Sequence, residues 1–142
     1  MNELQAAFGL LQLRYVDAAI RHRQEIDTLY RQALESVAGI DCPSLPLGIT
    51  WNHAYFPILV QPGYPLSRDE LYHRLREVGI HARRYFYPLI SEFPMYRNLS
   101  SAAPASLPIA HNVAKRVLCL PIYPALELEE MDKIIDIISG IG

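Results

Sequence analysis

Residues 116–139 read RVLCLPIYPALELEEMDKIIDIIS, and they determine which class of fold the chain can adopt. The short apolar run over Arg116–Pro121 predicts a buried strand, because its length and its branched residues suit a strand. After a turn, apolar side chains recur every three or four residues over Glu127–Ser139, which predicts a helix with one apolar stripe. A strand followed closely by such a helix predicts mixed helix and sheet, packed in two layers.

The middle of the chain supplies a second strand and a capped helix. Residues Thr50–Val60, TWNHAYFPILV, are rich in aromatic and branched residues and predict a strand, in which Pro57 indicates a bulge or an edge position. The sequence SRDE at Ser67–Glu70 is a capping box that begins a helix. We expect this helix to run to about Val78 and to be closed by Gly79.

Three further segments complete the body of the expected fold. Residues Ile80–Tyr85 predict a short strand, Pro88–Pro108 an irregular loop, and Leu107–Lys115 a short helix. Residues 48–142 are therefore expected to be α+β, a two-layer sandwich of helices and a small, mostly antiparallel three-stranded sheet. The length of 142 residues suits a single domain over 1–142.

The first 37 residues predict a long helix, roughly Asn2–Val37, that precedes this body. At about 1.5 Å per residue it spans roughly 50 Å, which exceeds the width of roughly 30 Å expected for a domain of this size. Its first half is apolar on more than one face, since Phe8, Leu10 and Leu13 cannot all enter one small core. We therefore expect it to pack against another domain or subunit. The alternative is a fully buried core helix.

Composition excludes several classes of protein. The chain is 51% hydrophobic and 20% charged, with a net charge of −2, so it is not intrinsically disordered and carries no basic signal for nucleic acid or an anionic membrane. No apolar run reaches the roughly 18 residues of a membrane span. An acidic residue near the start argues against a signal peptide, and two cysteines make no disulfide framework. The expected location is the cytoplasm.

Motifs for metal binding and nucleophilic catalysis are missing from the sequence. No two of the five histidines are spaced three or four residues apart, and neither cysteine has a close cysteine or histidine neighbour, so no metal site is expected. There is no Gly-x-Ser-x-Gly motif and no glycine-rich phosphate loop. The sequence therefore predicts no catalytic residue within the chain.

The densest polar and aromatic cluster is HARRYFYPLISEFPMYR, residues 81–97. Arginine binds carboxylate or phosphate through its planar fork, and tyrosine stacks on sugars or bases while donating a hydrogen bond. We therefore place candidate substrate-binding residues here, at Arg83, Tyr85 and Tyr87. The alternative is that the aromatic rings are part of the core and the arginines are surface ion-pair partners.

Three segments resemble the C-terminal part of the DegT/DnrJ/StrS sugar aminotransferases, a fold-type I family. Residues 1–13 with 21–34 resemble its interdomain helix, RRYFYPLISEFPMYR at 83–97 its substrate-side segment, and VLCLPIYPALELEEMDKIIDII at 117–138 its terminal strand and helix. The resemblance implies an enzyme that uses pyridoxal phosphate to aminate a keto sugar carried on a nucleotide. It supports Arg83, Tyr85 and Tyr87 as substrate-binding positions.

Two departures from the family limit what the resemblance implies. The family's full chain is more than twice this length, and its large domain, with the Schiff-base lysine and most of the phosphate site, is not matched here. Many members also carry a histidine where this chain has Ile90, so no such contact is expected. The only lysines, Lys115 and Lys133, read as exposed and lack a phosphate loop. Alone, the chain is expected to bind no pyridoxal phosphate and to be inactive.

The alternative function is a stand-alone module that binds or oligomerises without chemistry. Both hypotheses expose the same apolar helix, so both predict a homodimer. We expect self-association through the Leu4–Tyr15 face, with twofold symmetry.

Overall fold

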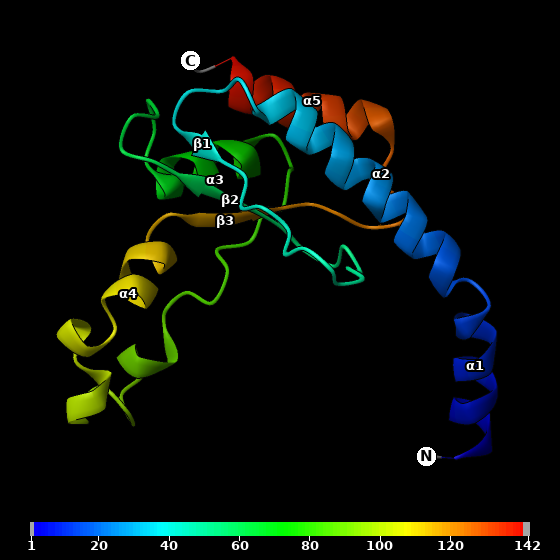
Figure 1. Ribbon diagram of the computed structural model, residues 1–142, viewed down its shortest axis with the longest axis horizontal. Coiled ribbons are helices and arrows are strands. Elements are labelled where there is room, and N and C mark those ends of the chain that lie inside the picture. The colour runs from blue at the N-terminus through cyan, green and yellow to red at the C-terminus, as the bar shows by residue number, and fades with distance from the viewer. Residues whose placement is uncertain (1, 141–142) are drawn as a thin grey trace.

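The computed structural model describes residues 2–140, and it is a mixed structure of helices and a small sheet (Figure 1). Three short 3-10 turns lie at Ile90–Glu92, Ser100–Ala102 and Pro104–Ser106, in the second half of the chain. In chain order the elements are α1 (Glu3–Leu13), α2 (Val16–Leu34), β1 (Ile40–Asp41), β2 (Phe56–Val60), α3 (Arg68–Glu77), α4 (Pro108–Ala114), β3 (Val117–Leu120) and α5 (Leu128–Ser139).

The sheet has three antiparallel strands in the order β1-β2-β3, which confirms the expected fold class. The third strand is not the one expected, however. Residues Ile80–Tyr85 form only a single bridge, from Arg83 to Cys119, and the two-residue strand β1 takes the third place. The reason is local, because Phe86 has a φ of 43° and turns the chain away from β3 just after this bridge.

The second strand is shorter than the predicted Thr50–Val60, because only Phe56–Val60 pair. His53 has a φ of 48°, which ends any extended conformation before Phe56. Pro57 lies opposite Cys119, whose backbone groups bond to Arg83 instead, and β1 does not reach Pro57 on the other side. The predicted bulge or edge position is therefore wrong, because β2 is the central strand and pairs in regular register, but Pro57 is tolerated since no partner needs its missing N–H.

The expected continuous helix over Asn2–Val37 is wrong in one respect, since it is two helices. The backbone N–H groups of Arg14 and Tyr15 bond to carbonyls only three residues back, at Leu11 and Gln12. This tight turn ends α1, and α2 begins at Val16 with a change of direction that Figure 1 shows clearly. No proline or internal glycine marks the break, so the sequence pattern does not reveal it.

Several other predictions are confirmed. The capping box forms at α3, where Ser67 Oγ accepts the Glu70 N–H and the Glu70 carboxylate accepts the Ser67 N–H. The predicted helices at Leu107–Lys115 and Glu127–Ser139 correspond to α4 and α5. The predicted strand Arg116–Pro121 corresponds to β3, all of whose residues are buried.

The core lies between the sheet and a layer of helices. In Figure 1, α2 and α5 run side by side across one face of the sheet, and α3 packs at its end. The largest fully buried side chains come from these elements and the strands: Tyr30, Phe56, Ile26, Leu34, Ile58, Leu71, Leu75, Leu118, Ile134 and Ile138. Neither α2 nor α5 covers the opposite face of the sheet.

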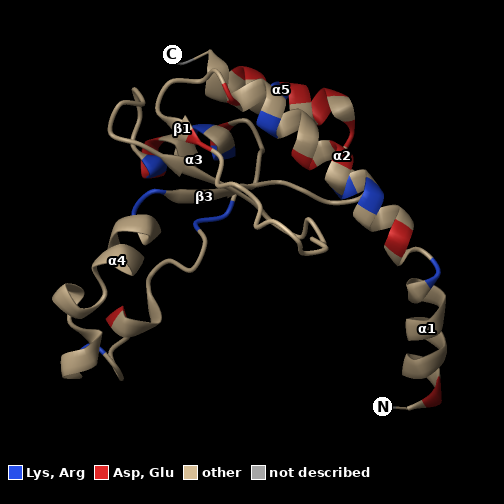
Figure 2. Ribbon diagram, viewed as in Figure 1, with Lys and Arg blue, Asp and Glu red and all other residues tan. Residues whose placement is uncertain are grey.

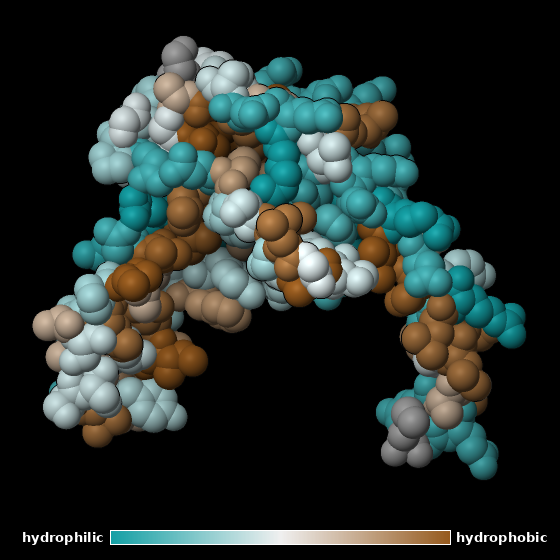
Figure 3. Space-filling model, in the orientation of Figure 1, coloured by the Kyte–Doolittle hydropathy of each residue, from teal (hydrophilic) through white to brown (hydrophobic). Residues whose placement is uncertain are grey.

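Two projections extend from this body on the same side and give the molecule the shape of an arch (Figure 1). One is α1, and the other is formed by residues 88–114, including α4. Both projections carry apolar patches among more polar residues (Figure 3), whereas charges of both signs are concentrated on α2, α3 and α5 (Figure 2). Among residues 2–140, no helix is both long and apolar enough to cross a membrane.

Candidate functional site

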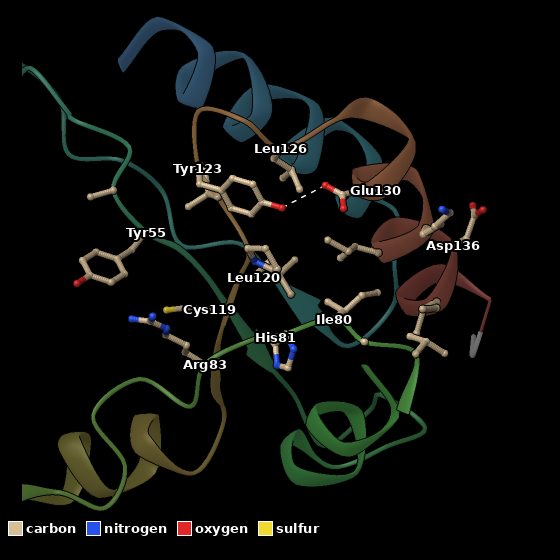
Figure 4. A pocket seen from close by; sticks show the side chains of 18 residues that line it. Tyr55, Ile80, His81, Arg83, Cys119, Leu120, Tyr123, Leu126, Glu130 and Asp136 are labelled. Carbon is tan, nitrogen blue, oxygen red and sulfur yellow. Dashed lines mark hydrogen bonds between the residues drawn. The ribbon is translucent and has the colours of Figure 1, made fainter. Parts of the chain in front are cut away.

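A cavity of about 910 Å³ opens beside β3, beneath α5 (Figure 4). Its walls come from four stretches of chain that meet there: residues 54–55, residues 78–83, residues 119–126 and one face of α5. Apolar side chains make up much of the lining: Ile80, Leu120, Leu126, Ile134 and Ile137. The charged and polar side chains that line it are Tyr55, His81, Arg83, Tyr123, Glu130, Lys133 and Asp136.

Arg83 is the one predicted site residue that lines the cavity directly. Its backbone exchanges two hydrogen bonds with Cys119, at 2.9 Å and 2.8 Å, so the edge of β3 fixes where its side chain begins. The guanidinium is exposed and forms no hydrogen bond or ion pair with any side chain of the described residues. Burial raises the pKa of the Cys119 thiol to about 11, although Arg83 opposes the shift. Cys119 is therefore a neutral wall of the cavity and no nucleophile.

Tyr85 lies beside the cavity and contacts a residue that lines it. Its ring centroid is 4.9 Å from that of Tyr55 and 4.1 Å from that of Phe86. Desolvation, and then the neighbouring Tyr55 hydroxyl, raise the pKa of Tyr85 above its ordinary value. Tyr85 therefore remains a neutral hydrogen-bond donor at physiological pH.

Tyr55 is a residue of this site that the sequence analysis missed. It lines the cavity with Arg83, contacts the ring of Tyr85 at a tilt of 48°, and is 46% exposed. Figure 4 shows Tyr55, Cys119 and Arg83 at the same end of the cavity, away from Asp136. The aromatic stretch around Tyr55 is a detectable signal, but the pattern predicts only a strand there and no binding residue. We call Tyr55, Arg83 and Tyr85 the cavity mouth.

Tyr87 lies away from the cavity mouth. Its ring is covered by two guanidiniums, with Arg68 Cζ at 4.7 Å and Arg84 Cζ at 5.2 Å from the ring centroid. Asp69 accepts hydrogen bonds from both arginines, at 2.9 Å and 3.2 Å. Although desolvation acts to raise it, the hydrogen bond from Arg84 and the charge of Arg68 hold the pKa of Asp69 below its ordinary value. The structure therefore brings Arg83 and Tyr85 together and places Tyr87 in this ion-pair cluster.

The far side of the cavity carries charges of both signs on α5. Tyr123 donates a hydrogen bond of 3.1 Å to Glu130, which Figure 4 shows bridging the cavity wall. Desolvation and this carboxylate raise the pKa of Tyr123 above its ordinary value. Lys133 lies three residues from both Glu130 and Asp136, and therefore on the same face of the helix.

The described residues do not by themselves fit a pyridoxal phosphate site. A lysine that reacts with this cofactor is normally desolvated or placed beside another cation, whereas Lys115 and Lys133 are exposed and Lys133 sits between two carboxylates. Among residues 2–140, no group of three or more histidine, cysteine, aspartate and glutamate side chains could hold a metal ion. The cavity mouth therefore offers binding contacts and no catalytic group: one guanidinium, from Arg83, and two tyrosine hydroxyls, from Tyr55 and Tyr85.

Comparison with known proteins finds aminotransferases over nearly the whole chain. The model of the DegT/DnrJ/EryC1/StrS aminotransferase family matches residues 1–139. A dTDP-4-amino-4,6-dideoxy-D-glucose transaminase from Escherichia coli is 46% identical over 140 residues, which are 99% of this chain and 38% of the relative. A dTDP-4-dehydro-2,3,6-trideoxy-D-glucose 4-aminotransferase from Saccharopolyspora spinosa is 33% identical, over 95% of this chain and 33% of the relative. The chain thus spans less than two fifths of these relatives.

Solved structures agree with the sequence comparisons. The DesI structure determined in the presence of its TDP-sugar product superposes with a TM-score of 0.88 and 28% identity, over 98% of this chain and 35% of DesI. DesV of S. venezuelae, in complex with a ketimine intermediate, gives a TM-score of 0.86 and 28% identity, over 99% of this chain and 36% of DesV.

Proposed function

The chain belongs to the DegT/DnrJ/EryC1/StrS aminotransferase family, and from this premise we propose that residues 1–142 form the substrate-side part of an aminotransferase acting on a nucleotide-linked keto sugar. The family uses pyridoxal phosphate, and relatives are named for dTDP-linked sugars. We assign this chain the binding of such a substrate and not the chemical step.

The cavity mouth is the observation that carries this proposal. Within residues 2–140 the Arg83 guanidinium pairs with no side chain, and its planar fork suits the oxygens of a diphosphate. Tyr55 and Tyr85 present rings and hydroxyls that can stack on a sugar or base and bond to it. A cation beside two aromatic hydroxyls suits a ligand that joins an anionic group to a polar ring, and a nucleotide-linked sugar has both.

We further propose that the lysine that binds the cofactor, and the cofactor's phosphate site, lie outside these 142 residues. The exposed positions of Lys115 and Lys133 support this. The chain alone is then inactive. Incubation with pyridoxal phosphate followed by borohydride reduction and mass spectrometry should yield no stoichiometric adduct. A full adduct on either lysine would contradict the proposal.

A chimera tests the substrate assignment. The part of the E. coli transaminase that matches residues 1–142 is replaced by this chain, and the transamination for which that enzyme is named is measured. We expect an active chimera in which Arg83→Ala raises KM for the dTDP-sugar at least tenfold. A folded chimera that binds cofactor but does not turn over any dTDP-sugar would overturn the proposal.

The proposed partner is a second copy of the chain, bound through α1. The exposed side chains Leu4, Phe8 and Leu11 follow the spacing of one face of α1 and are 82%, 64% and 49% exposed, and Tyr15, in the turn that ends α1, is 67% exposed. The same face would serve the alternative function, a binding module without chemistry. Activity of the chimera distinguishes the two, because the alternative predicts assembly with no turnover.

A further inference from the structure

The loop before β2 carries Tyr55 to the cavity mouth, and α2 holds this loop at three points. Arg31 Nη1 donates to the carbonyl oxygen of Pro43 at 2.8 Å, near the start of the loop. Arg23 donates two hydrogen bonds, of 3.1 Å and 2.9 Å, to the carbonyl oxygen of Asn52. The third contact is buried, and its residue on α2, Asp27, lies between Arg23 and Arg31.

That third point is a contact between Asp27 and His53. Asp27 Oδ2 and His53 Nδ1 face each other at 3.3 Å, with the two side chains 4% and 8% exposed. The other carboxylate oxygen of Asp27 accepts a hydrogen bond of 2.6 Å from Arg31 Nε. Neither of the two facing atoms has a hydrogen bond of good geometry within residues 2–140. The two groups lie within ion-pair distance, and moving either one away would leave a buried polar group without a polar neighbour, so the contact holds His53 against α2.

His53 in turn fixes the direction of the chain that leads to Tyr55. Its φ of 48° is unusual for a residue with a side chain and makes a sharp turn. Asn52 Oδ1 accepts the Ala54 N–H at 3.1 Å and completes the turn. Two residues after His53, the Tyr55 ring meets Tyr85 with centroids 4.9 Å apart, and Tyr55 is among the residues that line the cavity.

We propose that Tyr55 contacts the substrate, and that Asp27 and His53 are positioning residues that hold Tyr55 at the cavity mouth. The inference rests on the proposed function, because it names a further binding residue for the same site. Tyr55 acts directly, through its hydroxyl and its ring. Asp27 and His53 act only by setting where that ring lies.

Trp51 makes the positioning role measurable in the 142-residue chain. It is the only tryptophan, lies two residues before His53, and is 39% exposed. In Asp27→Asn the loop loses its buried anchor, and we expect Trp51 emission to shift to longer wavelength and acrylamide quenching to rise about twofold. His53→Asn, which tolerates the positive φ, should do the same. Asp17→Asn, at the exposed start of α2, is the matched control and should change neither.

The binding role is measured in the chimera. Tyr55→Phe should raise KM for the dTDP-sugar about fivefold to tenfold with kcat nearly unchanged, and Asp27→Asn should raise KM in the same direction. Circular dichroism confirms that each variant folds. Unchanged KM in Tyr55→Phe of an active chimera would overturn the inference while leaving the proposed function intact. Unchanged Trp51 emission and quenching in both anchor variants would overturn the positioning role.

Discussion

Arg68 shows how a single side chain can close the edge of this sheet. It is 3% exposed, and its Nη1 donates to the carbonyl oxygens of Ala114 and Val117 at 2.9 Å and 3.1 Å. Its Nε donates to Asp69, and its guanidinium covers the ring of Tyr87. A buried arginine is stable only when its donors are used, and here they join α3, α4 and β3.

Arg68→Ala should therefore destabilise the chain by about 2–4 kcal/mol, because two buried carbonyls lose their donor. Urea unfolding followed by circular dichroism measures this. Arg76→Ala is the control on the same helix, since Arg76 is exposed and should cost less than about 0.5 kcal/mol. Equal losses in the two variants would contradict the role given to Arg68.

Cys119 makes the stability depend on alkaline pH. Its folded pKa of about 11 lies above the ordinary value of 9.0, so the folded chain keeps its proton while the unfolded chain loses it. This contribution is complete below pH 9 and is lost as pH rises toward 11. In Cys119→Ala the fall in unfolding free energy between pH 8 and pH 10.5 should be smaller by about 1–2 kcal/mol. The same fall in both proteins would refute this.

The turn between α2 and β1 packs tightly against the loop that follows β2. Gly39 has a φ of +81°, and a Cβ added to it would lie 2.4 Å from the backbone nitrogen of Tyr64. Its carbonyl oxygen accepts the Gln61 N–H at 2.8 Å, which aligns β1 with β2. The glycine is therefore required both by its conformation and by the lack of space.

Gly39→Ala should cost about 2–4 kcal/mol, since backbone must move to make room. Gly48→Ala separates the two causes, because Gly48 has a φ of +78° but nothing within 4 Å of an added Cβ. We expect Gly48→Ala to lower the unfolding free energy by only about 1 kcal/mol, which is the cost of placing alanine at a positive φ without crowding. Thermal unfolding of both variants provides the test, and similar losses would show that crowding at Gly39 is unimportant.

The sequence predicted the elements whose signals are local. The capping box at Ser67 and the apolar stripe of α5 are complete within a few residues, so both predictions are confirmed. The break at Arg14–Tyr15 and the two-residue strand β1 have no local signal. The cavity mouth shows the same limit, because Arg83 and Tyr85 stood out within one segment, whereas Tyr55 joins them only through the turn at His53.

The arch of the whole molecule leaves the apolar face of α1 uncovered (Figure 3). Leu11→Asp places a charge at the middle of the face formed by Leu4, Phe8, Leu11 and Tyr15, and should convert a dimer to monomers because the charge loses its hydration in the interface. Sedimentation velocity over a range of concentrations measures this. Ala6→Asp adds the same charge on the opposite side of α1 and should leave assembly unchanged. A dimer that persists in Leu11→Asp would place the interface elsewhere.

The two edges of the sheet also determine whether the protein can aggregate by strand pairing at high concentration. Cys119 gives both of its backbone groups to Arg83, the Val117 carbonyl goes to Arg68, and the strand at the opposite side, β1, is two residues long. Within residues 2–140, neither border offers the long row of free amides that would template a strand from a neighbouring copy. Crowded solutions should therefore yield discrete complexes joined through helices, and thioflavin T should detect no fibrils while the fold is intact.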